Sequence, residues 1–172
     1  MTTLIIVCGE PYAGKTTLGQ ALVQRFRHAS VDVDGTKERL YGLGLKDEDL
    51  TNEQWVRIYE QTDQQIADYL HAGQSVVDDS RNFRQFERVH AKDIAEGCRA
   101  HCVIIYVNTP EAILRQRLHE NRAHPSRHDL NDHDFEQLLL LVEPPTDEEQ
   151  PLVFTCGESL NEWIDRHSAD LS

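Results

Sequence analysis

The chain of 172 residues has the length of one ordinary domain, and its 39% hydrophobic and 27% charged residues are typical of a globular protein. Its net charge of −13 repels polyanions, so a nucleic acid is not an expected partner. The longest apolar runs, LIIV and VIIYV, are far shorter than the roughly 20 residues of a membrane helix, so we expect no membrane partner and a cytoplasmic location. The four cysteines form no CxxC pair, and we expect buried thiols instead of a zinc site or disulfides.

Apolar runs typical of strands alternate along the chain with segments typical of helices. The runs lie at residues 3–8, 29–33, 74–79, 101–109 and 151–156. The helical segments lie at residues 15–27, 51–73, 83–97, 110–121, 132–143 and 159–168. In the longest of them Thr51 and Gln54 have the spacing of a capping box, and the expected buried side carries Trp55, Ile58, Ile66 and Tyr69. The alternation predicts a single three-layer α/β domain over residues 1–172, with a mainly parallel sheet of about five strands and right-handed crossovers.

The segment GEPYAGKT, at residues 9–16, fits the pattern GxxxxGK[ST] and lies between the first strand and the first amphipathic helix. Its two glycines let the backbone curl so that successive N–H groups point inward, and the helix that begins near Lys15 directs the positive end of its dipole into the same hollow. Because such a hollow favours phosphate, we expect Lys15 to contact the β- and γ-phosphates of ATP and the Thr16 hydroxyl to bind Mg²⁺. The expected nucleotide-binding residues are Gly9, Ala13, Gly14, Lys15, Thr16 and Thr17.

Two carboxylates, Asp32 and Asp34, come at the end of the second expected strand, where side chains of a parallel sheet face the same crevice as the loop after the first strand. Both are expected near the substrate. Asp34 directly precedes the glycine that is expected to end the strand, so it is the preferred catalytic residue, accepting the proton of an attacking hydroxyl. The alternatives are that Asp32 has this role and that Asp34 is a solvated acid at the start of a helix.

A second pair, Asp78 and Asp79, closes the third expected strand. Adjacent residues of a strand alternate between its faces, so one of the two is expected to point into the site. Asp78 is preferred as the residue on the Mg²⁺ side and Asp79 as a substrate contact, and the reverse order stays open. Arg81 follows closely and is expected either to contact substrate or to serve at the start of the next helix.

An arginine-rich segment follows the fourth expected strand, with Arg115, Arg117 and Arg122 on a helix and the loop behind it. A planar cation brought over the phosphates stabilises the charge of the transferred group and excludes water, so we expect a lid at about residues 115–134. Spacings of two and five residues put the arginines on different faces of the helix. Arg117 and Arg122 are preferred over Arg115 as catalytic residues.

The chain resembles the predicted-kinase branch of the AAA-type P-loop ATP-binding proteins, which is related to zeta toxins, chloramphenicol phosphotransferase and polynucleotide kinases. The resemblance spans nearly all of the chain. The segments that carry it are GEPYAGKTT, DVDGTKERL, VVDDSRNFRQFER, RQRLHENR, RHDLNDHDFEQ and VEPPTDEE, the last with Val142 in place of Phe in the family's FEPP signature. It implies that Lys15 and Thr16 bind Mg·ATP, that an Asp after the second strand contacts the acceptor hydroxyl and that the arginines after Val107 form a lid.

The function expected from these features is an ATP- and Mg²⁺-dependent kinase that phosphorylates a hydroxyl of a small molecule. Two alternatives remain at this stage. One is a kinase of RNA or aminoacyl-tRNA, because VVDDSRNFRQFER also looks like the corresponding stretch of seryl-tRNA kinases, although the acidity of the chain argues against it. The other is a nucleotide-dependent regulatory ATPase without an acceptor.

Overall fold

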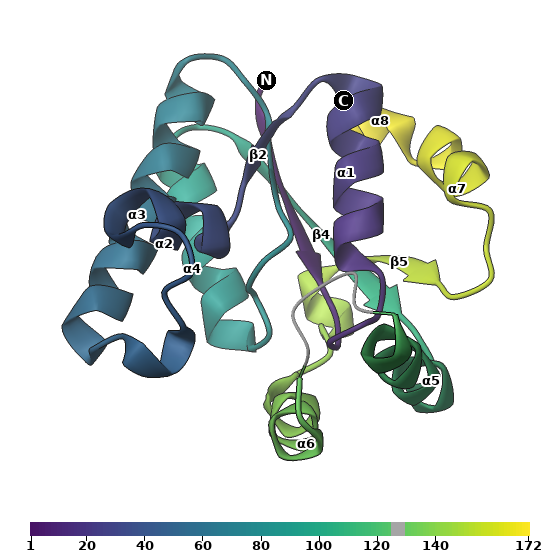
Figure 1. The fold of residues 1–172 in the computed structure, drawn as a ribbon. Helices are drawn as coiled ribbons and strands as arrows, with labels where there is room; N and C mark the ends of the chain where they lie inside the picture. The colour runs from purple at the N-terminus through teal and green to yellow at the C-terminus, as the bar shows by residue number, and fades with distance from the viewer. Residues whose placement is uncertain (125–129) are drawn as a thin grey trace.

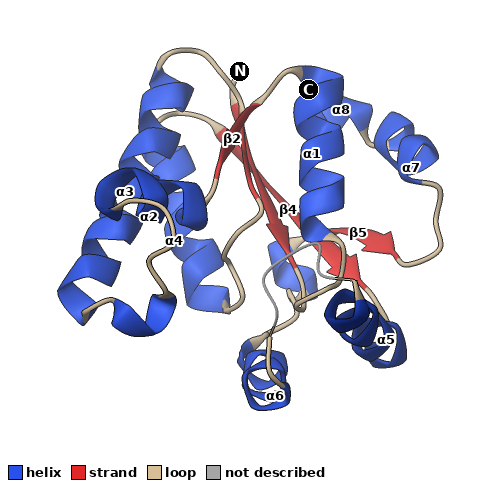
Figure 2. Ribbon diagram, in the orientation of Figure 1, coloured by secondary structure: helices blue, strands red, loops and turns tan. Residues whose placement is uncertain are grey.

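A five-stranded parallel sheet forms the centre of the molecule (Figures 1 and 2). The structure, a computed structural model, describes residues 1–124 and 130–172. The strands are β1 (Thr3–Cys8), β2 (Ala29–Val31), β3 (Val76–Asp78), β4 (His101–Asn108) and β5 (Leu152–Thr155). Their order is β2-β3-β1-β4-β5, and every neighbouring pair is parallel. The α/β fold with a parallel sheet, expected from the alternation of strands and helices, is confirmed.

Helices cover both faces of this sheet (Figure 2). They are α1 (Lys15–Phe26), α2 (Val33–Tyr41), α3 (Asn52–His71), α4 (Gln85–Gly97), α5 (Glu111–Ala123), α6 (Asp132–Leu141), α7 (Leu160–Arg166) and α8 (Ser168–Leu171), with 3-10 turns η1 (Asp47–Asp49) and η2 (Asp147–Glu149). On one face Ile5 of β1 lies in a core with Leu22 of α1 and Trp163 of α7. On the other face Ile6 lies in a second core with Ile66 of α3. The two cores explain why β1 is apolar at successive positions, since its side chains are buried on both sides.

The longest helix, α3, begins with the capping box expected from its sequence. The Thr51 side chain accepts a hydrogen bond from the backbone of Gln54, whose own side chain accepts one from the backbone of Thr51. The expected buried side is right for Ile58 and Ile66, but Tyr69 is 38% exposed and Trp55 is half-buried. The buried row follows i, i+4 spacing and consists of Ile58, Thr62, Ile66 and Leu70.

The largest difference from the sequence expectation lies between β2 and α2. β2 ends at Val31, two residues earlier than expected, and α2 begins at Val33 with Asp32 as its N-cap. The Asp32 carboxylate accepts a hydrogen bond from the backbone N–H of Gly35 at 2.5 Å. Gly35, expected to end the strand, therefore lies in the first turn of the helix, because the side chain of Asp32 satisfies an N–H group there.

Two further expectations concern the whole chain. Within residues 1–124 and 130–172, no helix is long and apolar enough to cross a membrane. All four cysteines are free, as expected, but only Cys8 is fully buried and the other three are partly exposed.

Candidate active site

The loop between β1 and α1 has the backbone that a phosphate-binding loop needs. Gly9 and Gly14 adopt φ values of 143° and 113°, in the left-handed region that favours glycine. A Cβ at Gly9 would lie 2.8 Å from the carbonyl oxygen of Val107 on β4, so the loop passes too close to the sheet for any side chain. Gly14 is the N-cap of α1, no side chain of the described residues caps this helix end, and its first turn carries no acid. The N–H groups and the positive dipole end of α1 are therefore available to an anion.

Lys15 lies over this loop. Its Nζ donates to the carbonyl oxygens of Gly9 at 2.8 Å and Glu10 at 2.9 Å, and lies 5.1 Å from the ring centroid of Phe83. The ammonium group thus contacts the loop after β1 and lies near the loop after β3. A phosphate held by the N-terminus of α1 would meet this cation, as the sequence predicts.

Asp79 is the carboxylate of the second pair that faces α1. A Cβ at Gly19 of that helix would lie 2.9 Å from its Oδ2, and the Thr16 side chain in the first turn is near enough to lower the pKa of its carboxyl. Burial raises the pKa of the Asp79 carboxyl, and the charges of Asp78 and Asp32 raise it further, whereas Thr16 and Lys15 act in the opposite direction. A bound cation would lower the free energy of the charged form.

Asp78, which the sequence favoured for the Mg²⁺ side, points away from α1. Its side chain is fully buried and accepts hydrogen bonds from Ser80 N at 3.3 Å and Oγ at 3.1 Å, Arg81 Nε at 2.9 Å and Asn82 Nδ2 at 3.2 Å. The physical reason is the alternation of side chains along β3, which gives Asp78 to the side of α3 and α4 and leaves Asp79 on the side of α1. Asp78 therefore holds the loop after β3 through hydrogen bonds on the side of the sheet that faces away from α1.

Arg81, expected near the substrate, is part of the same buried cluster. Its Nε donates to Asp78 at 2.9 Å and its Nη2 donates to Asp63 of α3 at 2.6 Å, with only 9% of its side chain exposed. The other oxygen of Asp63 lies 2.7 Å from Nε2 of His90. Arg81 therefore ties the loop after β3 to α3, and the structure gives it this contact in place of an open position.

The structure separates the two acids after β2. Asp32, the N-cap of α2, is close enough to Asp79 to act on its pKa. Asp34 is 77% exposed and forms an ion pair of 3.3 Å with Lys37, which also binds Asp47 at 2.7 Å. Of the two alternatives left open by the sequence, Asp32 is the acid that acts on Asp79, whereas Asp34 pairs with Lys37 at the surface.

A cavity of about 700 Å³ lies beside the loop between β1 and α1, over the ends of β4 and β5. Arg117 of α5 lies at its wall, with Nη1 donating to the carbonyl oxygens of Tyr12 at 2.9 Å and Ala13 at 2.8 Å, and Nη2 lying 3.7 Å from Cys156 Sγ. The carbonyl of Ala13 also accepts a hydrogen bond from Thr109. The lining includes Gly14, Thr17, Asn121 and Phe154.

The other two arginines contact the start of α6. Arg122 donates to the carbonyl oxygen of Leu130 at 2.7 Å and pairs with Asp132 at 2.8 Å. Arg115 binds Glu111 and Glu136, each at 2.6 Å, and lies over the ring of Phe135. Arg117 thus differs from the other two in its hydrogen bonds to Tyr12 and Ala13 of the loop between β1 and α1. Residues 125–129 of the expected lid lie outside the described part of the chain.

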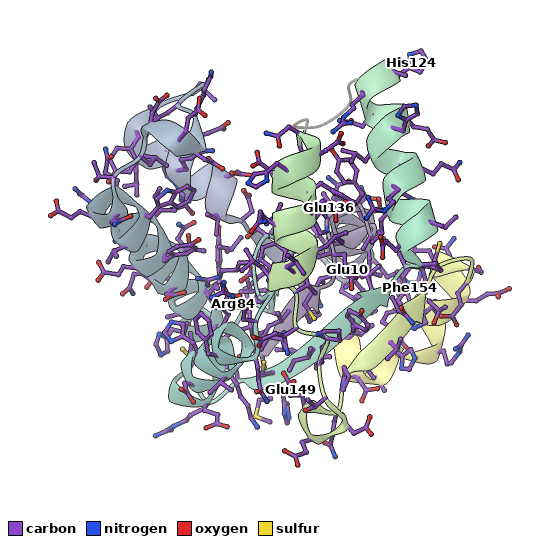
Figure 3. All side chains as sticks on the ribbon, turned by 90° about the horizontal axis from the view of Figure 1, so that it is seen from below. Glu10, Arg84, His124, Glu136, Glu149 and Phe154 are labelled. Atoms are coloured by element: carbon purple, nitrogen blue, oxygen red, sulfur yellow. The ribbon has the colours of Figure 1, made fainter. Side chains whose placement is uncertain are left out.

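Sequence reasoning missed a buried ion pair between Arg88 of α4 and Glu149. Arg88 is 1% exposed, and its Nε and Nη2 donate to the two carboxylate oxygens of Glu149 at 2.6 and 3.1 Å. Figure 3 shows Glu149 on the segment that follows α6, well away in sequence from α4. The VEPPTDEE segment was the available signal, but no spacing rule pairs residues 61 positions apart.

Comparison with known proteins identifies the family. A family model described as "AAA domain" matches residues 4–145. The chain therefore belongs to the AAA domain family. Among curated proteins, no sequence matches it.

Solved structures similar to this AAA domain protein include kinases. A protein from Chloroflexus aurantiacus j-10-fl described as a "putative kinase" is 25% identical, with a TM-score of 0.74 over 96% of this chain and 98% of that one. Kti12 from Chaetomium thermophilum, in complex with ADP-AlF3, is 14% identical, with a TM-score of 0.78 over 98% and 99% of the two chains. The APS kinase CysC of Mycobacterium tuberculosis, in complex with AMPPNP and APS, is 15% identical, with a TM-score of 0.69 over 99% and 96%. The protein is of the P-loop kinase type, and the two more distant matches show the fold alone.

Proposed function

We propose that this protein is an ATP- and Mg²⁺-dependent kinase that transfers the γ-phosphate to a hydroxyl of a small molecule. The observation that carries the proposal is the convergence of Lys15, Thr16 and Asp79 at the open N-terminus of α1. The kinase neighbours support it, since one of them was solved with an ATP analogue and a small-molecule substrate.

The nucleotide would bind across the N-terminus of α1. The cavity beside Arg117 has the size of a small-molecule site and suits the base and sugar. The phosphates would then run over the loop of Gly9 and Gly14 toward Lys15, where N–H groups and the ammonium neutralise their charge. The γ-phosphate would end on the side of β3 and β2, opposite the cavity.

The donor set beside this position fits Mg²⁺. Mg²⁺ prefers oxygen ligands and keeps several of its waters, and the Thr16 hydroxyl and the Asp79 carboxylate supply oxygen atoms at the N-terminal part of α1. Thr16 would bind the ion directly and Asp79 would hold it directly or through a water. When bound, the ion neutralises charge on the β- and γ-phosphates.

The acceptor would enter from the side of α2 and α3. We propose that Asp32 accepts the proton of the attacking hydroxyl, because it lies at the end of β2 and acts on Asp79. Its capping bond to Gly35 fixes the position of the carboxylate, and a carboxylate can accept further hydrogen bonds. We further propose that Arg117 and Arg122 belong to a lid over the nucleotide, with Arg117 on the phosphate loop already.

An acceptor screen tests this function. ADP formation is measured with Mg·ATP in the presence of sugars, nucleosides and amino alcohols, and with tRNA as a separate arm. A kinase of small molecules gives ADP formation that one class of hydroxyl compound accelerates, and the Lys15→Ala variant abolishes the acceleration. Hydrolysis that no compound accelerates would identify a regulatory ATPase, and acceleration by tRNA alone would identify an RNA kinase.

A further inference from the structure

The loop after β3 carries two residues that face the loop of Lys15. Asp79 lies against α1, where a Cβ at Gly19 would be 2.9 Å from its Oδ2, and the Phe83 ring lies 5.1 Å from Lys15 Nζ. Between them Asn82 adopts φ 74°, a left-handed conformation that is uncommon outside glycine. Asn tolerates this conformation better than most residues, so the contacts around the loop, more than backbone strain, set its position. The positions of Asp79 and Phe83 therefore depend on the hydrogen bonds that other segments make to this loop.

One set of contacts to the loop comes from the buried cluster of Asp78, Arg81 and Asp63. Asp78 accepts from Asn82 and Arg81, and Arg81 reaches Asp63 of α3. These contacts fix the inner side of the loop.

The other set of contacts to the loop comes from residues 143–149, which we name the strap. The backbone N–H of Glu143 donates to the carbonyl oxygen of Phe83 at 2.8 Å, and the Glu143 carboxylate accepts from the N–H of Gln85 at 2.8 Å. Glu143 thus satisfies a backbone N–H group at the start of α4 and holds the outer end of the loop.

The ion pair of Arg88 and Glu149 completes the strap. Besides its two bonds to Glu149, the Arg88 guanidinium donates through Nη1 to the carbonyl oxygens of Asn82 at 3.3 Å and Phe83 at 3.4 Å. Thr146 N donates to Oε2 of Glu149 at 2.9 Å, which fixes the carboxylate from its own side. A planar guanidinium held in this way can bind two carbonyl oxygens of the loop in one orientation only.

Stability alone is a weak reason for this arrangement. A buried ion pair loses the hydration of both charges, and apolar residues of similar volume often stabilise a fold as well or better. The strap also continues directly from α6, whose Phe135 packs against the ring of Tyr12 in the phosphate loop, with the ring centroids 6.2 Å apart. The strap therefore joins two elements of the proposed active site.

We propose that Arg88, Glu143 and Glu149 are positioning residues for phosphoryl transfer: they hold the loop after β3 so that Asp79 faces Thr16 and Phe83 faces Lys15. This inference rests on the proposed function. None of the three residues needs to touch the nucleotide, and their effect passes through the carbonyl oxygens of Asn82 and Phe83 and the N–H of Gln85.

The first test is amide hydrogen exchange in the nucleotide-free protein. In the Glu149→Gln variant, exchange in residues 79–85 should rise about tenfold or more relative to wild type, because the loop opens locally. The matched control is Asp165→Asn, which removes one partner of the Arg25–Asp165 pair, a contact of 2.8 Å with both side chains 61% exposed. The control should leave exchange in residues 79–85 unchanged. Unchanged exchange in Glu149→Gln as well would overturn the inference.

The second test measures the Mg²⁺ concentration that half-saturates binding of a fluorescent ATP analogue. Loss of a residue that supports a metal ligand typically weakens metal binding about 10- to 100-fold, so Glu149→Gln should raise this concentration by that factor, with Mg²⁺-independent nucleotide binding close to wild type. A change in melting temperature with no change in Mg²⁺ dependence would show a merely structural role and overturn the inference alone. A wild-type protein that binds no ATP analogue in a Lys15-dependent way would overturn the proposed function, and this inference with it.

A second variant keeps the test decisive if Glu149→Gln fails to fold. The double variant Arg88→Met/Glu149→Met removes both charges and keeps apolar volume, so it should fold. It also removes the donors to Asn82 and Phe83, so we expect the same faster exchange and weaker Mg²⁺ dependence. A double variant that folds and behaves as wild type in both measurements would show that the Arg88–Glu149 pair does not position the loop after β3, and would overturn the inference.

Discussion

Asp79, the residue that follows β3, lies against α1 beside Gly19, and the Thr16 side chain in the first turn of that helix lowers the pKa of its carboxyl. This contact places a hard oxygen pair beside the N-terminus of a helix that no side chain of the described residues caps. The proposed anion and cation sites would thus lie next to each other, which is the arrangement that Mg·ATP requires.

The raised pKa of Asp79 predicts that this residue lowers the stability of the nucleotide-free protein at neutral pH. A carboxyl whose pKa is raised on folding destabilises the fold as pH rises above its ordinary value of 3.8, because the unfolded chain then releases the proton at a lower pH than the folded state does, which favours unfolding. Asp79→Asn should therefore raise the melting temperature of the nucleotide-free protein at pH 7, and the difference should shrink toward pH 4. Mg·ATP should stabilise wild type more than the variant. Thermal denaturation against pH measures both, and a variant less stable than wild type at pH 7 without nucleotide would contradict this account.

Gly9→Ala tests the close approach of the phosphate loop to β4. The new Cβ would lie 2.8 Å from the carbonyl oxygen of Val107 at φ 143°, so we expect a loss of about 1–3 kcal/mol in the free energy of unfolding and weaker nucleotide binding. Gly97→Ala is the control, because the residue is helical and, apart from its chain neighbours and the backbone of its own helix, no atom of the described residues lies within 4 Å of its new Cβ. It should be neutral or stabilising by up to about 1 kcal/mol. Urea denaturation compares the two, and equal losses would argue against a special constraint at Gly9.

The acids after β2 should differ sharply in effect. Asp32→Ala removes the N-cap of α2, with an expected cost of about 0.5–2 kcal/mol, and should lower the rate of transfer about 10²–10⁴-fold if Asp32 accepts the hydroxyl proton. Asp34→Ala, at a side chain 77% exposed, should stay within about 0.5 kcal/mol of wild type and keep its rate. Turnover at saturating ATP separates the two acids. A large loss of rate in Asp34→Ala with normal turnover in Asp32→Ala would restore the role that the sequence gave to Asp34.

Much of this site is local in sequence and was therefore predictable. The GxxxxGK[ST] pattern, the strand before it and the helix after it lie within residues 3–26, and the Thr51–Gln54 capping box spans one turn. The order of Asp78 and Asp79 was not predictable, because alternation says that two neighbours face opposite sides but not which side each faces. The start of α2 at Val33 depends on one capping bond. The Arg88–Glu149 pair depends on tertiary packing between segments far apart in the chain.

Arg117 and Arg115 lie two residues apart on α5 and should have different roles. Arg117→Ala removes hydrogen bonds to Tyr12 and Ala13 at the cavity wall, so nucleotide affinity should fall about 10- to 100-fold. Arg115→Ala removes an exposed pair with Glu111 and Glu136, which is worth about 1 kcal/mol or less, and should leave affinity near wild type. Titration calorimetry with a non-hydrolysable ATP analogue measures both. Equal affinities for the two variants would place the nucleotide away from the cavity of Arg117.

The fate of the γ-phosphate tests the central claim most directly. With γ-labelled ATP, Mg²⁺ and the acceptor found by the screen, the label should appear on a hydroxyl of the acceptor in equal amount to the ADP formed. Lys15→Ala should reduce this transfer about 10²–10³-fold while its circular dichroism spectrum stays that of wild type, because the lysine is proposed to bind phosphate and does not pack in the core. Label recovered only as inorganic phosphate, or transfer that Lys15→Ala leaves unchanged, would contradict the account of this protein as a kinase that works through Lys15, Thr16 and Asp79.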